Sequence, residues 1–180
     1  MQPAHILWIN MVTTVTLGLT LAFEPAEPGV MCRPPRRRDA PLLPGYLLWR
    51  VGLVSVLFML GVFAVYGFAI EAGRGVAVAQ TMVVNAIVVM EMFYLFNVRY
   101  QHMTSFSLRG AAGTPPVLAA IAAVVVAQAA FTYLPAMQAL LGTAPLRPIE
   151  GALVIGLGVL LMLVMEVEKG LARRLGIAQG

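Results

Sequence analysis

Five long apolar segments constrain this chain more than any other feature of its sequence. They cover residues 4–23, 46–70, 76–97, 114–134 and 149–166. Each has about the length that an α-helix needs to cross the hydrocarbon core of a membrane, and each is too long for a strand of a membrane barrel. Only 11% of the 180 residues are charged, whereas soluble domains have about 25%. The sequence therefore predicts an all-α membrane protein, a bundle of five transmembrane helices.

The connections between these segments differ in their content of basic residues. Three of them carry most of the arginine and lysine: the arginine- and proline-rich loop 24–45, the loop 98–113 and the tail 167–180. The other two loops carry one arginine each, Arg74 and Arg147. Because basic residues accumulate on the cytoplasmic side of a membrane, we expect the three basic stretches to be cytoplasmic and the N-terminus to lie outside. Residues 1–180 then form a single transmembrane domain.

Glu91 is the acid that lies deepest inside a predicted membrane segment. A carboxylate at such depth costs at least about 2.5 kcal/mol on insertion scales, and acids there usually serve transport. One interpretation is therefore a ligand for a cation or a proton, and the alternative is a neutral glutamate that packs through hydrogen bonds. Tyr94 follows three residues later on the same side of the helix. Asn85 and Asn97 lie further round the helix and are predicted to form hydrogen bonds between helices.

The first apolar segment carries an amide and several hydroxyl groups. Asn10, Thr13 and Thr14 are spaced at i, i+3 and i+4, which places them on one face of an α-helix. Their oxygen atoms are the kind of ligand that suits hard cations. Alternatively, threonines in membrane helices bond back to the carbonyl four residues earlier, and Thr16 and Thr20 fit this second interpretation better.

Charged and aromatic residues near the ends of the segments have simpler interpretations. The arginines 36–38 indicate membrane topology, with anionic lipid binding or docking onto a soluble domain as further options. Trp49 and Arg50 are predicted to be interfacial anchors at the start of the second segment. Four residues at the end of the last segment are predicted to form a solvated, salt-bridged face: Glu166, Glu168, Lys169 and Arg173.

The sequence lacks the motifs of several chemistries. It has no glycine-rich nucleotide loop, so no bound cofactor is expected. Its lone cysteine, Cys32, and two separated histidines, His5 near the outer interface and His102 in a loop, do not predict a zinc or copper site. The net charge of +4 comes from loop residues that topology explains, so nucleic acid is not an expected partner. The chain by itself is not expected to catalyse a reaction.

Three short motifs carry a resemblance to a known family. The run ILWINMVTT at residues 6–14, AFEP at 22–25 and MCRPPR at 31–36 resembles the sixth membrane helix and following loop of P-type cation-transporting ATPases, especially the calcium-pump-like bacterial branch. The run VMEM at 89–92, followed by Asn97, is similar to the eighth helix of these pumps. Residues 163–174 resemble their tenth helix and basic tail. The resemblance implies that the chain contains helices six to ten.

The resemblance also implies roles for particular residues. Asn10 and Thr13 match cation ligands of the sixth helix, and Glu91 matches a ligand of the eighth. Thr14 stands where calcium pumps have an aspartate, so the transported cation could be calcium, another metal or a monovalent ion. The family's phosphorylation motif, Asp-Lys-Thr-Gly-Thr, is absent here, which would leave ATP and magnesium to missing domains. Loop 24–45 matches the loop that lies against the phosphorylation domain.

The sequence thus predicts the C-terminal membrane segment of an ATP-driven cation pump in a bacterial plasma membrane. It would contribute part of the ion pathway and be inactive alone. Since the first segment begins next to Met1, we expect a fragment whose partners are membrane lipid and the missing N-terminal ATPase portion. Two alternatives stay open: a stand-alone structural or regulatory membrane protein, and a secondary transporter that uses Glu91 as a proton relay. Many such carriers have an inverted repeat, and none is seen here.

Overall fold

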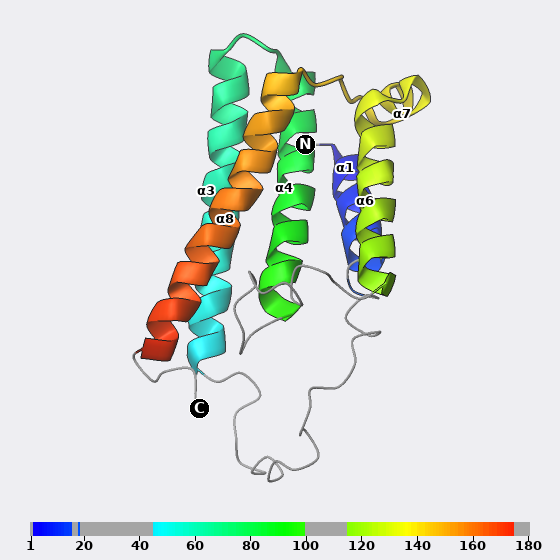
Figure 1. Cartoon of the computed structure of the whole chain (residues 1–180). Helices are drawn as coiled ribbons and strands as arrows, with labels where there is room; N and C mark the ends of the chain where they lie inside the picture. The colour runs from blue at the N-terminus through cyan, green and yellow to red at the C-terminus, as the bar shows by residue number, and fades with distance from the viewer. Residues whose placement is uncertain (1, 16–17, 19–44, 100–114, 175–180) are drawn as a thin grey trace.

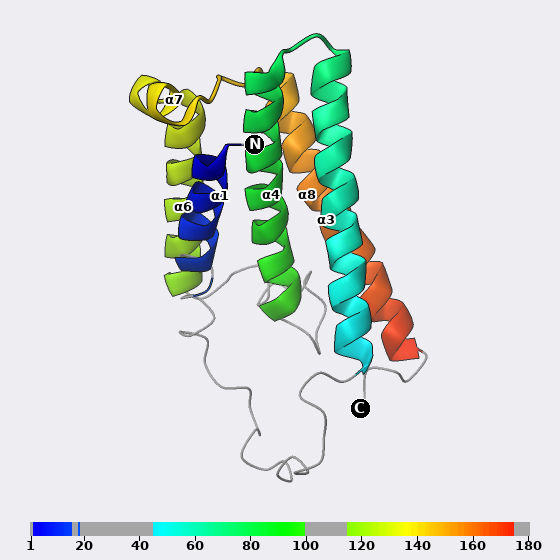
Figure 2. The same ribbon diagram turned by 180° about the vertical axis from the view of Figure 1, so that it is seen from behind.

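The computed structural model of the protein describes residues 2–15, 18, 45–99 and 115–174, and every regular element within these ranges is a helix. In chain order the elements are α1 (Pro3–Ile9), the π-helix η1 (Asn10–Val15), α3 (Gly45–Glu71), α4 (Val76–Arg99), α6 (Pro115–Tyr133), α7 (Pro135–Leu141) and α8 (Pro148–Arg174). Helix α4 lies in the middle, with α3 and α8 on one side and α1 and α6 on the other (Figures 1 and 2). This position makes α4 the most enclosed helix.

Three helices, α3, α4 and α8, are long and apolar enough to cross a membrane. Helices α6 and α7 make a fourth span if they are counted together, although they bend by 75° at their junction. The described residues therefore confirm an all-helical protein with three or four candidate membrane spans. The fifth span, predicted at 4–23, extends beyond the described part of the first helix. Its presence and the orientation of the termini stay predictions.

The C-terminal ends of α8 and α6 differ from those predicted. Apolar spacing explains the first difference and a proline explains the second. Helix α8 continues past Glu166 to Arg174, because apolar residues keep their helical spacing through Val167 and Leu171. Helix α6 ends at Tyr133, and Leu134 is extended, with φ −78° and ψ 120°, as is usual before a proline. Pro135 then starts α7, which occupies part of the predicted loop 135–148.

Helix α8 lies against α4 at a glycine. A Cβ atom added to Gly158 would come 2.7 Å from Cγ1 of Val89 and closer still to the ring of Phe93. Real Cβ atoms do not approach neighbours this closely, so only glycine lets the two helices meet here. Small residues of this kind let helices in a membrane gain van der Waals contact, since lipid provides no hydrophobic force between them.

Helix α1 is fixed to α6 and α7 through aromatic and polar contacts. The ring of Trp8 stacks on Phe131 with centroids 5.2 Å apart. Nε2 of His5 donates a hydrogen bond of 2.7 Å to the carbonyl oxygen of Leu141, and the His5 ring is fully buried. His5 is therefore buried between α1, α6 and α7, and its predicted position near the outer membrane interface stays a prediction.

Candidate functional site

A pocket between the first helix and α4 contains the acid singled out from the sequence. We call it the Glu91 pocket. It has a volume of about 290 Å³ and is lined by residues from both helices: Thr13, Thr14, Gly18, Glu91, Tyr94, Leu95 and Val98. The sequence placed Tyr94 on the same side of its helix as Glu91, and the pocket confirms this. Thr13 and Thr14 thus line one pocket with Glu91, although 77 residues separate Thr14 from Glu91.

The Glu91 carboxyl group is only partly satisfied within its pocket. The hydroxyl of Thr13 lies beside it, but that hydroxyl also donates a hydrogen bond of 2.8 Å to the carbonyl oxygen of Ile9. Oε2 of Glu91 is buried and has no hydrogen-bond partner among the described residues. A buried carboxyl oxygen without a partner is costly. A proton or a bound cation would lower that cost.

The π-helix η1 changes which polar residues of the first helix share a face. Hydrogen bonds in a π-helix span five residues rather than four, so residues at i and i+3 separate further round the axis. Thr13 is accordingly buried, with 7% of its surface exposed, whereas Asn10 and Thr14 are exposed. Asn10 is not among the residues that line the Glu91 pocket. The expected common face of all three residues therefore does not form, although π-helical turns often occur at functional sites.

The described residues contain no cluster of three or more histidine, cysteine, aspartate or glutamate side chains that could hold a metal ion. The Glu91 pocket supplies one carboxylate and two hydroxyls. Hard cations such as calcium take six to eight oxygen ligands. The pocket could therefore hold part of a cation's ligand shell, with further oxygens from elsewhere.

A second polar group on α4, which we call the Lys169 cluster, joins α3, α4 and α8. It consists of Arg50, Asn97, Glu166 and Lys169. Nζ of Lys169 donates to the carbonyl oxygen of Asn97 at 2.6 Å and to Oε1 of Glu166 at 3.2 Å. Nδ2 of Asn97 donates to the same Glu166 oxygen at 3.0 Å, and Arg50 donates to Oδ1 of Asn97. Opposite charges and amide groups pair here, while Nε of Arg50 is buried without a hydrogen-bond partner among the described residues.

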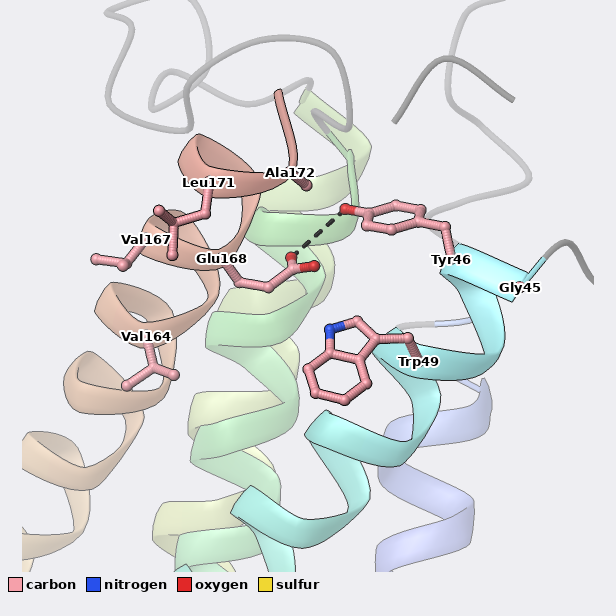
Figure 3. Close-up of a pocket in the computed structure, with 8 residues that line it drawn as sticks. All are labelled: Gly45, Tyr46, Trp49, Val164, Val167, Glu168, Leu171 and Ala172. Atoms are coloured by element: carbon pink, nitrogen blue, oxygen red, sulfur yellow. Dashed lines mark hydrogen bonds between the residues drawn. The ribbon is translucent and has the colours of Figure 1, made fainter. Parts of the chain in front are cut away.

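The Lys169 cluster corrects two predictions. Lys169 is only 2% exposed and Arg50 only 3% exposed, so they are neither a solvated face nor an interfacial anchor. The reason is that α8 extends beyond Glu166 and brings Lys169 against α3 and α4. Beside this cluster, Tyr46 donates a hydrogen bond of 3.4 Å to Glu168, above a groove that Trp49 borders (Figure 3).

Two predictions about asparagines are confirmed. Asn97 bonds to residues of α3 and α8, as described above. Asn85 bonds to Thr132 of α6 through Nδ2, at 3.0 Å. Both residues therefore connect helices, as their positions on α4 indicated.

Several residues named from the sequence lie outside the described part of the chain. They are Thr16, Thr20, Cys32, Arg36, Arg37, Arg38, His102 and the loop 24–45 up to the start of α3 at Gly45. The Lys169 cluster was not predicted as a site. A signal for it was present: Glu166 and Lys169 are spaced at i, i+3 within an apolar pattern that continues past them.

The helices and the Glu91 pocket define a class of protein: a multi-pass membrane protein with a polar site inside its bundle. Comparison with known sequences gives the family. The family described as "Cation transporting ATPase, C-terminus" matches residues 1–171. The chain therefore belongs to the C-terminal region of the P-type cation-transporting ATPases.

Individual relatives agree with this assignment. The probable cation-transporting ATPase F of Mycobacterium tuberculosis is 43% identical over 144 residues, which cover 80% of this chain and 16% of that protein. The cation-transporting ATPase pma1 of Synechocystis is 30% identical over 155 residues, or 79% of this chain and 16% of that protein. The calcium-transporting ATPase of Bacillus subtilis is 28% identical over 158 residues, 86% of this chain and 17% of that protein. The chain thus spans about a sixth of the length of these relatives.

Proposed function

We propose that this chain is the membrane segment of an ATP-driven cation pump and supplies part of the cation-binding pathway through Glu91, Thr13 and Thr14. The observation that carries the proposal is Oε2 of Glu91, a buried carboxyl oxygen without a hydrogen-bond partner among the described residues. The family assignment supports it, because the relatives are named as cation-transporting or calcium-transporting ATPases.

The chemistry of the Glu91 pocket suits a hard cation but leaves its ligand shell incomplete. One carboxylate and the hydroxyls of Thr13 and Thr14 offer oxygen ligands. Asn10 is exposed on the first helix, where its amide oxygen is available to a cation held against the rest of the pump. With a threonine at position 14 instead of a second acid, the site supplies a single negative charge, so calcium and other cations are both candidates.

ATP hydrolysis would come from the rest of the pump. The sequence lacks the phosphorylation motif Asp-Lys-Thr-Gly-Thr, so we infer that the chain is inactive alone and that ATP and magnesium bind elsewhere. Loop 24–45, with its arginines, would contact the phosphorylation domain. The basic loops and the C-terminus would face the cytoplasm of a bacterium, with the helices in its inner membrane.

The test is a Glu91→Gln substitution in a pump reassembled from this chain and the N-terminal portion of a bacterial relative. We expect the half-saturating cation concentration for ATPase activity to rise about 10- to 100-fold, since a charged ligand contributes about 1.5–3 kcal/mol. The matched control is Glu71→Gln, the same chemical change at an exposed position at the end of α3. An unchanged cation affinity in the Glu91 variant would contradict the ligand role.

A further inference from the structure

A buried histidine connects the start of α1 to the end of α7. The His5 ring is fully buried and meets the ring of Phe131 edge-on, with centroids 6.0 Å apart. Its Nε2 lies 2.7 Å from the carbonyl oxygen of Leu141, the last residue of α7. Its Nδ1 lies 3.5 Å from the backbone nitrogen of Gln2, the N-cap residue of α1. One side chain thus contacts three helices.

The two polar contacts determine which ring nitrogen of His5 carries a hydrogen. A carbonyl oxygen can only accept, so Nε2 must donate its hydrogen to Leu141. A backbone N–H can only donate, so Nδ1 must be without a hydrogen to accept the N–H of Gln2. Both contacts are therefore made by the neutral imidazole, and a second proton on the ring would point at the N–H of Gln2.

A second proton on His5 would be costly in this position. It would replace an accepted hydrogen bond by two N–H groups that face each other, and it would place a positive charge in a site without solvent exposure. The carbonyl oxygen of Leu141, at the C-terminal end of α7, would keep its hydrogen bond and favour the charge. A single neutral acceptor does not replace the water that a charged imidazole loses on burial.

The described elements around His5 offer no carboxylate to pair with its charge. Helices α1, α6 and α7 and the π-helix η1 contain no acidic or basic residue apart from His5. The other titratable residues on elements that pack against α1 are Tyr133 on α6 and Glu91, Tyr94 and Arg99 on α4. Glu91 lies beside Thr13, eight residues after His5. Beyond α7, Arg147 is exposed and Glu150 is in an ion pair elsewhere. Neither acid forms an ion pair with His5.

We propose that His5 is a pH-sensitive latch between α1 and α7. The neutral ring holds the two helix ends together. A proton on Nδ1 removes the contact with Gln2 and makes burial of the ring unfavourable, so a fall in pH shifts the equilibrium toward a form in which the start of α1 has separated from α7. Histidine suits this role, because its ordinary charge change falls between about pH 5 and 8.

The position of the latch relates it to the outer side of the membrane and to the Glu91 pocket. The basic loops predict that the end of the bundle at which α7 lies is outside (Figure 1), so the latch would respond to the pH there. Helix α1 continues into η1, whose Thr13 and Thr14 line the Glu91 pocket. Opening of the latch would therefore loosen one wall of that pocket. An effect on cation binding rests on the proposed function, whereas the latch itself does not.

Trp8 reports whether α1 is in place. It stacks on Phe131 and donates a hydrogen bond of 3.2 Å to Oε1 of Gln128, and the chain has one other tryptophan, Trp49. The test is fluorescence of the full 180-residue chain with Trp49→Phe, in detergent. As the pH falls from about 8 to about 5, the emission of Trp8 should shift to longer wavelength and its quenching by acrylamide should increase. Unchanged emission over this range would overturn the proposal.

Two histidine variants in the same background assign the response to His5. His5→Gln keeps an N–H donor for Leu141 and an oxygen acceptor for Gln2 but does not titrate, so the emission of Trp8 should no longer depend on pH. His102→Gln is the same change at the other histidine of the chain and should keep the response. A response that persists in His5→Gln, or that disappears in His102→Gln, would contradict the latch.

Nuclear magnetic resonance gives a direct measurement, which also serves if His5→Gln does not fold. In the His102→Gln protein labelled with ¹³C-histidine, the single histidine signal belongs to His5. Its chemical shift and the emission of Trp8 should change with the same midpoint. A His5 signal that titrates without a change in Trp8 emission, or that does not titrate between about pH 5 and 8, would show that the ring is no latch.

Discussion

Helix α4 contributes to two polar sites that differ in how their acidic side chain is paired. In the Lys169 cluster, Glu166 is paired with Lys169 and Asn97. In the Glu91 pocket, one carboxyl oxygen is buried without a hydrogen-bond partner among the described residues. A paired acid contributes to holding helices together, whereas an acid with a carboxyl oxygen that lacks a hydrogen-bond partner is available to a ligand. The comparison separates a structural site from a candidate transport site on one helix.

The largest expected effect is in the Lys169 cluster. Lys169→Met should lower the free energy of unfolding by about 3 kcal/mol, because it removes the cation that pairs with Glu166 inside the bundle. Thermal unfolding of the purified chain in detergent would measure the change. As a control, Arg147→Met removes a cation from an exposed position and should change stability by less than about 0.5 kcal/mol. A Lys169 variant as stable as this control would show that the cluster does not hold α8.

An intermediate effect is expected where α8 meets α4 at Gly158. Gly158→Ala should destabilise the protein by about 1–3 kcal/mol, because the added methyl group overlaps Val89 and Phe93. Gly156→Ala is the matched control, since a Cβ at that position meets nothing within 4 Å. Denaturant unfolding of both variants would give the difference. Equal stability of the two would mean that the close approach of α4 and α8 is not required.

The smallest effect is expected for the acid of the Glu91 pocket. Glu91→Gln should change the free energy of unfolding by less than about 0.5 kcal/mol, because Oε2 has no hydrogen bond to lose and the amide oxygen can keep the contact with the Thr13 hydroxyl. Glu166→Gln is the same chemical change in the Lys169 cluster and should cost more, since it removes a charge from a buried pair. Unfolding in the same detergent would compare them. A Glu91 variant as destabilised as the Glu166 variant would assign Glu91 a structural role.

The sequence predicted the helices more reliably than it predicted the contacts between them. The apolar lengths predicted α3, α4 and most of α8, since crossing a membrane requires a run of apolar residues that can be read directly. Pro135 marked the bend, but residues 135–148 were predicted to form a loop, because a short apolar segment can be a helix or a loop. The extension of α8 to Arg174 was missed, since charges among the apolar residues were taken as solvated.

The sequence by itself determined that the chain is an all-helical membrane protein, that Glu91 is its deeply placed acid, and which family it resembles. These follow from composition, helix length and local motifs. Only the tertiary structure decided that Thr13 and Thr14 line one pocket with Glu91, that Asn10 does not line it, and that Lys169 is buried against Asn97. Such contacts depend on how distant helices approach and rotate against one another. That arrangement is fixed by packing at positions such as Gly158, which no local pattern specifies.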